Sequence, residues 1–430
     1  MEKPSAAMVK SWASIWYSWG CRQNLQGISM LRDQRLRGRR KILNSIREAN
    51  RVARIDIAQE TGISQATVTT VTAEMLREGL IEEVPRSNGS GESKRGRPRV
   101  ALKIRGDAHF VAGVKVANNS MSVAIMDFEG ELLGEFNTSI QERVSPARNL
   151  AVEIRTAVER ACAESNLALT QLSAVGVGLA GVIDATKGMV HWSPSLNSRK
   201  VDFGKVLREI IELPVFLDND ANTVATAEQY FGHGKGVSDF LVITIESGVG
   251  LGVVLGGEIY RGTRGCGAEF GHTKVHLDGA LCRCGQRGCL EAYVADYALL
   301  REASVAGMFA KDDTVGNKIQ LLLDRAYQGE ALPRSIIDRA GRMFAMGLAN
   351  LVNIFDPELI ILSGERIMAD HLYAETVIDS IKDSIVQIDL PPPKVVIHKW
   401  GDSMWARGAA AYALQEVAKT SLEELGGHVE

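Results

Sequence analysis

Apolar residues follow two different patterns along the chain, and the change falls near residue 108. Between residues 35 and 105 they first recur at helical spacing and then alternate with polar residues, as in three helices followed by a hairpin. From about Ala108 onward, short runs rich in Val and Ile alternate with helical segments, which is typical of an α/β domain. The pattern therefore predicts a small N-terminal domain over residues 35–105 and a larger one over residues 108–420.

The small domain has the order of a helix-turn-helix. A first helix is predicted where the apolar residues of 42–46 share one face, and a second over residues 54–61. Gly62 ends the second helix, and Ser64 is a good N-cap for a third. The third helix turns its apolar residues inward and leaves small polar residues outward near its N-terminus. We therefore expect contacts with DNA base edges from Ser64, Gln65, Ala66, Thr67, Thr69 and Thr70.

A basic hairpin follows the third helix. Residues 80–84 and 100–104 alternate like two strands, and the loop between them is rich in Ser, Gly and Arg. In such a wing, Arg95 and Arg97 are expected to contact phosphates or a narrow minor groove. Taken alone, the three helices would also suit a protein-interaction module, and the hairpin would also suit a solvated basic loop. Together and in this order they predict a winged helix-turn-helix.

The larger domain is predicted to contain two ligand-facing features on a sheet. The apolar pattern predicts a hairpin made of an apolar strand over residues 109–127 and a second strand over residues 130–136. An amphipathic helix is predicted over residues 147–166. Four further buried strands are predicted, over residues 174–182, 215–217, 240–245 and 359–362. The strand at 215–217 runs into the polar residues 218–222, and the strand at 240–245 runs into a glycine-rich turn. Polar residues at the end of a buried strand are typical of ligand sites in α/β sheets.

Charge is divided unevenly between the two domains. Of the 430 residues, the first 105 contain 20 Lys and Arg against 10 Asp and Glu, whereas the remainder contains 29 against 42. A basic head on an acidic body indicates an anionic polymer as the partner of the head. No apolar run is long enough for membrane insertion, because the longest candidate, residues 240–257, contains Glu246 and five glycines. Residues 1–34 lack the apolar core of a signal peptide, so we expect a disordered or mis-annotated extension on a cytoplasmic protein.

Four metal-ligand residues are clustered in the sequence: His272, Cys282, Cys284 and Cys289. Three thiolates and one imidazole are the ligand set of a closed tetrahedral zinc site, which leaves no position for a catalytic water. Gly285 and Gly288 permit the left-handed backbone that so short a loop requires. A chance cluster or a disulfide is the alternative, but the whole chain has only six cysteines. The spacing therefore predicts a structural Zn²⁺.

The order of these segments resembles the ROK family (repressors, open reading frames and kinases) in its transcriptional-regulator branch, over about residues 38–418. The ligand spacing and both flanking glutamates match the family's zinc signature. The resemblance implies an α/β, actin-like (ribonuclease H-like) fold of two lobes with sugar bound in the cleft. Lobe 1 would cover about residues 108–235 plus the C-terminal helix, and lobe 2 about residues 238–398. The sugar-binding residues that it implies are Asn219, Asp220, Glu269, His272, Glu291 and Ser195, although a kinase would have asparagine where Ser195 stands. A helix N-cap for Asp220 and a structural brace for Glu269 are the simpler alternatives.

Kinases of this family hold nucleotide phosphates with an Asp-x-Gly-x-Thr loop and a Gly-Thr-Gly loop. The first loop here reads Lys-Val-Ala-Asn-Asn over residues 115–119, and the second begins with Glu246 and Ser247. A carboxylate about 4 Å from a phosphate costs about 4 kcal/mol per unit charge at an effective dielectric near 20. Asp220, the general base of the kinases, is therefore expected to be vestigial, and the chain is not expected to be an enzyme.

These expectations combine into a DNA-binding transcriptional regulator, a repressor rather than an activator, that responds to a sugar or sugar phosphate of carbohydrate metabolism. A homodimer or homotetramer would present two heads to a pseudo-palindromic operator in double-stranded DNA. Two alternatives stay open: an active ATP-dependent sugar kinase with an accessory DNA-binding head, and a body that docks a sugar-transport protein. The sequence identifies neither the sugar nor the operator.

Overall fold

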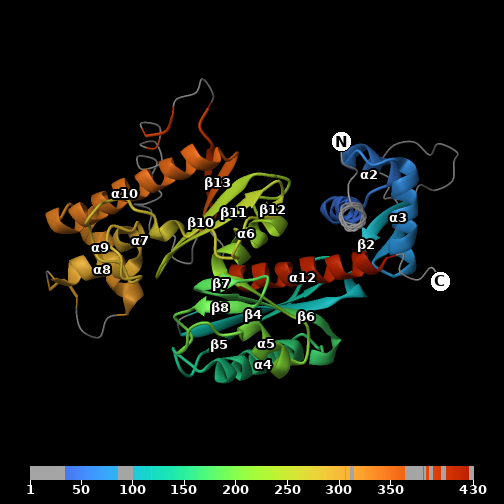
Figure 1. Cartoon of the computed structure of the whole chain (residues 1–430), viewed down its shortest axis with the longest axis horizontal. Helices are drawn as coiled ribbons and strands as arrows, with labels where there is room; N and C mark the ends of the chain where they lie inside the picture. The colour runs from blue at the N-terminus through green and yellow to red at the C-terminus, as the bar shows by residue number, and fades with distance from the viewer. Residues whose placement is uncertain are drawn as a thin grey trace, which may run out of the picture. The chain divides into compact units, whose positions relative to one another are not determined.

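The computed structural model describes residues 34–85, 100–117, 119–305, 307–309, 314–363, 381, 384–386, 391–398 and 403–425 (Figure 1). The chain forms two compact units. The smaller comprises described residues from 34 to 109, from 127 to 131 and from 415 to 425, and the larger comprises those from 110 to 126 and from 132 to 414. Residues 1–33 of the predicted extension (1–34) lie outside the described residues, and Gln34 begins the first helix. The wing segment with Arg95 and Arg97 also lies outside the described residues.

The smaller unit has the predicted winged helix-turn-helix elements. They are a helix over residues 34–49, α2 (Arg54–Thr61), α3 (Gln65–Arg77), β1 (Ile81–Pro85) and β2 (Val100–Ile104), with β1 and β2 antiparallel. Gly62 ends α2 in the left-handed region at φ 70°, and its N–H donates to the carbonyl of Ala58. The core forms because Ile42, Ile57 and Met75 are fully buried between the helices.

The same unit includes a loop and a helix end from the rest of the chain. The final residues of α12 (Met404–Glu424) belong here, although the helix begins in the larger unit. The Arg39 guanidinium donates to the Leu422 carbonyl at 2.9 Å and pairs with Glu74 at 2.9 Å. Lys103 pairs with Glu129 at 2.9 Å. Side chains of the first helix and of β2 therefore bind the end of α12 and the loop at residues 127–131 within the smaller unit.

The larger unit contains two five-stranded sheets. The first has the order β5 (Leu132–Ser139), β4 (Ser120–Asp127), β3 (Phe110–Val116), β6 (Leu172–Leu179), β9 (Val215–Asn219). The second has the order β12 (Glu258–Ile259), β11 (Val249–Leu255), β10 (Phe240–Ile245), β13 (Leu359–Ser363), β14 (Lys394–His398). A short hairpin pairs β7 (Val182–Asp184) with β8 (Met189–Trp192). In each sheet the central strands are parallel and the hairpin strands antiparallel, as in the actin-like fold predicted from the sequence.

Helices cover both sheets (Figure 1). Those of the larger unit are α4 (Ala147–Glu164), α5 (Phe203–Ile211), α6 (Asp220–Phe231), α7 (Glu291–Val294), α8 (Asp296–Val305), α9 (Val315–Tyr327) and α10 (Ala331–Phe355). The first half of α12 packs closely on the first sheet, because β3 and β6 present Gly113 and Gly176 to it. A side chain at either glycine would overlap the backbone of Ala406 or Ala409 in α12.

One strand prediction was wrong. Residues 109–127 form two strands, β3 and β4, instead of one strand of a hairpin. The N–H of Ala117 donates to the carbonyl of Ser120, which closes a turn next to Asn119. Asparagine favours turns because its side chain bonds its own backbone, and apolar periodicity alone does not register this. Among the described residues, no helix is long and apolar enough to cross a membrane.

Candidate functional site

The predicted metal ligands lie together. One donor atom from each of His272, Cys282, Cys284 and Cys289 lies within 4.8 Å of the others. The Cys284 and Cys289 sulfurs are 3.7 Å apart, and the Cys282 sulfur is 3.7 Å from the His272 Nδ1. Because a zinc–sulfur bond is about 2.3 Å, two sulfurs of a tetrahedral site lie about 3.8 Å apart. The four donors therefore fit a four-coordinate metal ion.

Glycine makes the metal-ligand loop possible. Gly285 and Gly288 have φ values of 88° and 74°, in the left-handed region that disfavours other residues. The Cys282 N–H donates to the Gln286 carbonyl at 2.8 Å and so closes the turn. The loop then runs directly into α7, whose first residue is Glu291.

Glu291 connects the metal-ligand loop to the second sheet. One carboxylate oxygen accepts from the Tyr297 hydroxyl at 3.3 Å and lies 3.6 Å from the Cys282 sulfur. The other oxygen accepts from the N–H of Val249, the first residue of β11, at 3.4 Å. Glu291 is 9% exposed, so these contacts fix its position at the edge of the site.

Asn219 and Asp220 lie where β9 ends and α6 begins. The Asn219 side chain caps α6 by accepting from the Ala221 N–H at 2.9 Å, and its amide donates to the Gly181 carbonyl at 2.7 Å. Asp220 also accepts from the Ala221 N–H, at 3.0 Å. The residue that the structure assigns as the N-cap is therefore Asn219, and Asp220 is the first residue of the helix.

A buried ion pair lies directly beside these residues. Asp218, which is 1% exposed, pairs with the Arg261 guanidinium at 2.7 Å. The other Asp218 oxygen accepts from the Asn222 side chain at 2.9 Å. The Arg261 guanidinium also stacks 5.0 Å from the Tyr412 ring of α12. Nothing in the local sequence indicates this pair, since its partners come from β9 and from the loop after β12.

Three carboxylates influence one another in this region. Crowding by protein atoms, which withdraws the carboxylate from water, and then the charges of Asp220 and Glu291 raise the pKa of Glu269 to about 7, although the residue as a whole is exposed. Burial also raises the pKa of Asp220, and the Lys115 charge opposes that rise. The structure therefore brings Asp220 and Glu291 close enough to Glu269 for their charges to interact with it.

Lys115 occupies an unexpected position at the end of β3. It is 5% exposed, and its ammonium lies 3.6 Å from the centre of the Trp405 ring. The resemblance to the family predicts that this lysine takes the place of the aspartate in the first phosphate loop of the kinases. Asn118 of the same loop lies outside the described residues. In the second loop, the Glu246 N–H donates to the Gly248 carbonyl at 2.9 Å, which closes a tight turn.

Ser195 and the DNA-contact residues also have defined positions. Ser195 is 5% exposed, and its carbonyl accepts from the Ser145 N–H at 3.0 Å. Ser64 caps α3 by accepting from the Thr67 N–H at 3.2 Å. The residues predicted to meet DNA are all exposed on α3 or at its cap: Ser64, Gln65, Ala66, Thr67, Thr69 and Thr70.

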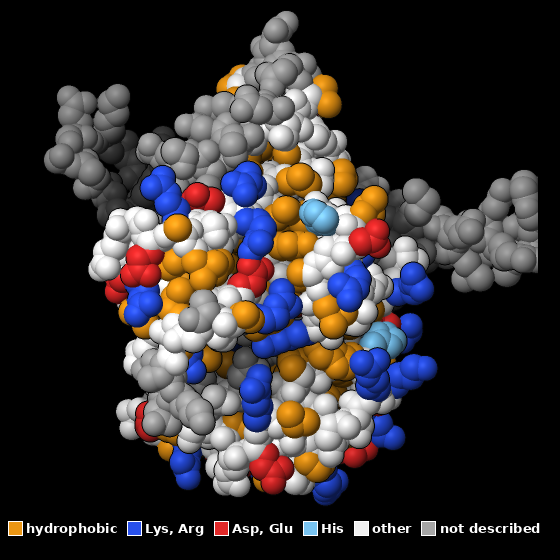
Figure 2. Space-filling model, turned by 90° about the vertical axis from the view of Figure 1, so that its left-hand side faces the viewer, with side chains coloured by type: hydrophobic (Ala, Val, Ile, Leu, Met, Phe, Trp, Pro, Cys, Tyr) orange, Lys and Arg blue, Asp and Glu red, His pale blue; other side chains and the backbone are white. Residues whose placement is uncertain are grey.

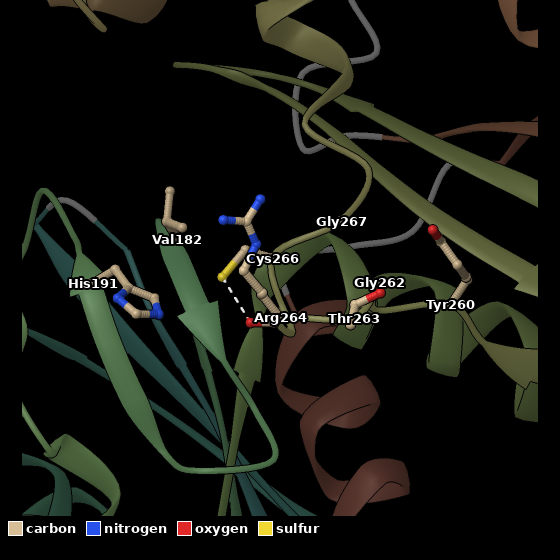
Figure 3. A pocket seen from close by; sticks show the side chains of 8 residues that line it. All are labelled: Val182, His191, Tyr260, Gly262, Thr263, Arg264, Cys266 and Gly267. Carbon is tan, nitrogen blue, oxygen red and sulfur yellow. Dashed lines mark hydrogen bonds between the residues drawn. The ribbon is translucent and has the colours of Figure 1, made fainter.

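A cavity of about 500 Å³ lies between the β7–β8 hairpin and the loop after β12 (Figure 3). It is lined by Val182, His191, Tyr260, Gly262, Thr263, Arg264, Cys266 and Gly267, none of which was predicted as a site residue. On the face that Figure 2 shows, Lys and Arg side chains gather along the middle, between its upper and lower halves. The loop after β12, residues 260–267, is called the cavity loop. It leads into Glu269, whose charge acts on Cys266 of the lining, so the cavity adjoins the carboxylates described above.

Comparison with known proteins agrees with this architecture. Residues 111–416 match the ROK family, and residues 39–82 match a winged helix-turn-helix DNA-binding family. The xylose repressor of Caldicellulosiruptor bescii is 26% identical over 388 residues, which cover 87% of this chain and 95% of the repressor.

Two solved structures are similar as well. A ROK family transcriptional regulator, described as a homologue of the Escherichia coli MLC protein, has a TM-score of 0.74 at 23% identity and covers 91% of this chain and 98% of its own. A ROK hexokinase from Thermus thermophilus has a TM-score of 0.62 at 30% identity and covers 72% of this chain and 99% of its own. The ROK family match extends over most of this chain, and a match to a winged helix-turn-helix DNA-binding family precedes it. The chain therefore belongs to the ROK family.

Proposed function

We propose that this protein is a sugar-responsive, DNA-binding repressor of carbohydrate-metabolism genes. The observation that carries the proposal is the presence, in one chain, of an exposed polar recognition helix and a cluster of carboxylates fit for sugar hydroxyls. The xylose repressor matches almost the full length of this chain, head included, whereas the hexokinase matches 72% of it. These matches favour a regulator over a metabolic enzyme.

Sugar recognition is assigned to the residues around the end of β9 and the metal-ligand loop: Asn219, Asp220, Glu269, His272, Glu291 and Ser195. Carboxylates accept hydrogen bonds from adjacent hydroxyls, and the Asn219 amide both donates and accepts. Such sites discriminate strongly between sugars, because a missing hydroxyl leaves a buried polar group without its partner.

The metal is proposed to be zinc with a structural role. Its three thiolates and one imidazole would complete the coordination and leave no position for a catalytic water. Bound zinc would fix the loop between His272 and Glu291, and both of these residues are assigned to sugar contact. The metal would therefore act on sugar binding through the shape of the loop.

Kinase activity is not expected. Phosphoryl transfer depends on holding and neutralising the nucleotide phosphates. Lys115 stands in place of the loop aspartate and packs on Trp405, and Glu246 places a carboxylate in the second phosphate loop. Asp220 would remain as a vestigial base that contacts sugar.

Two assays test the proposal. Full-length protein incubated with random duplexes should select a pseudo-palindromic sequence, as expected of a homo-oligomer with two heads. Replacing both Arg95 and Arg97 with Gln should weaken this binding and reduce its salt slope by about 2, since each phosphate contact contributes about 0.9. The exposed Arg334→Gln on α10 is the matched control. Selection of no sequence, or steady ATP consumption with any hexose, would favour the kinase alternative.

A further inference from the structure

The cavity between the β7–β8 hairpin and the loop after β12 has polar and cationic walls. His191 comes from β8, and Arg264 comes from the loop on the opposite side (Figure 3). Thr263 adds a hydroxyl, and Tyr260 adds a ring that is 46% exposed. A volume of about 500 Å³ is within the range of ligand pockets and exceeds what one sugar ring fills.

A carboxylate that lies against the loop after β12 is already paired. Asp184 of β7 has a side chain that is 5% exposed, and it lies 3.0 Å from the Lys187 ammonium. Burial opposes ionisation of Asp184, but hydrogen bonds from the Lys187 side chain and backbone N–H, together with the charges of Lys187 and His191, hold the pKa of Asp184 below its usual range. Arg264 is exposed, and among the described residues no ion pair of its guanidinium is found. The positive charge of Arg264 is therefore available to a ligand.

The cavity loop is held in one conformation. Gly262 and Gly265 both have φ of 71°, and a side chain on Gly265 would collide with Asp184. The Gly267 N–H donates to the Arg261 carbonyl at 2.8 Å, and Arg261 is itself bound to Asp218. The loop is thus fixed beside Asn219 and Asp220 at its start, and it reaches Glu269 at its end.

We propose that this cavity receives an anionic substituent of the effector, so that the effector is a sugar phosphate or a sugar acid. This inference rests on the proposed function and narrows its ligand class. The ring hydroxyls bind the carboxylates at Asp220 and Glu269, and the anion binds the Arg264 guanidinium beside His191. A guanidinium binds a phosphate or carboxylate through two parallel hydrogen bonds, a geometry that a neutral hydroxyl does not match.

Calorimetry on the full-length protein tests the inference. Glucose, mannose, galactose and N-acetylglucosamine are each compared with their 6-phosphates and 1-phosphates and with the corresponding uronic acids, and inorganic phosphate is included. For the sugar that binds, at least one anionic derivative should bind tenfold or more tightly than the neutral form, and this preference should fall as salt rises. The increase in affinity over the neutral sugar is compared between the sugar phosphates and the uronic acid. The anion with the larger increase is the one that the cavity binds.

The decisive variant is Arg264→Gln, with Arg334→Gln as the matched control. Arg264→Gln should remove the anion preference and leave the affinity for the neutral sugar within twofold, and Arg334→Gln should change neither. A neutral sugar that binds as tightly as its anionic derivatives, or an anion preference that survives Arg264→Gln, overturns the inference and leaves the proposed function standing. Absence of binding by every sugar, neutral or anionic, overturns both.

Discussion

At the scale of single residues, the Asp218–Arg261 pair connects β9 to the loop after β12. A buried carboxylate that loses its partner charge keeps the full cost of leaving water. We expect Arg261→Met to reduce the free energy of unfolding by about 3–5 kcal/mol, as measured by urea denaturation. The double variant Asp218→Asn with Arg261→Met should recover part of this loss, because no unpaired charge remains. A loss below about 1 kcal/mol for Arg261→Met would show that the pair does not stabilise the fold.

Glu269 gives a prediction of pH dependence. Its pKa is raised to about 7, so the carboxylate that we propose to accept from sugar hydroxyls is lost as the pH falls through 7. Between pH 8 and pH 6 the ionised fraction falls about tenfold, and the affinity for a neutral sugar should fall by up to the same factor. The ligand must be neutral, so that its own charge does not change. Calorimetry should show a flat profile for Glu269→Gln, and an equally steep profile in that variant would exclude Glu269 as the titrating group.

Residues were predictable from the sequence where their chemistry is local. The four metal ligands and Gly285 lie in one short segment, so their spacing alone indicated the site. Lys115 and Arg264 were not identified as site residues, because their surroundings depend on tertiary structure. Trp405, which packs on Lys115, and the β7–β8 hairpin, which faces Arg264, lie far away in the sequence. No periodicity or spacing connects such partners.

At the scale of elements, we propose that the order of the metal-ligand loop depends on a bound metal. Full-length protein should contain one zinc per chain, and the double variant Cys282→Ala with Cys284→Ala should contain none. Loss of metal should also abolish the sugar response, because Glu291 follows directly on the loop. Metal content is measured by atomic absorption, with Cys266→Ala as the control that keeps the metal. A double variant with no metal and a normal sugar response would show that the loop needs no zinc.

Element boundaries followed the sequence where turn chemistry is strong. Gly62 and Ser64 mark the end of α2 and the start of α3, and the structure has both. The division of residues 109–127 into β3 and β4 was not predicted, since the apolar character continues on both sides of the turn. The close packing of α12 on Gly113 and Gly176 could not be predicted from the sequence either, because a glycine in a strand does not indicate which helix packs against it.

At the scale of the whole molecule, the basic head and the acidic body carry different functions on one chain. The helix α12 has residues in both compact units, and Arg39 of the head donates to the carbonyl of Leu422 near its end. Sugar binding that changes the closure of the two lobes would therefore have a covalent path to the head.

The most direct test measures duplex affinity of the full-length protein with and without sugar. Fluorescence anisotropy on the selected duplex should show at least a tenfold change in Kd on saturation with the sugar that calorimetry identifies, a coupling of about 1.4 kcal/mol. The affinity of the same sugar for the DNA-bound protein should change in the same direction and by the same factor, since coupling is reciprocal. An unchanged Kd at saturating sugar would contradict the account.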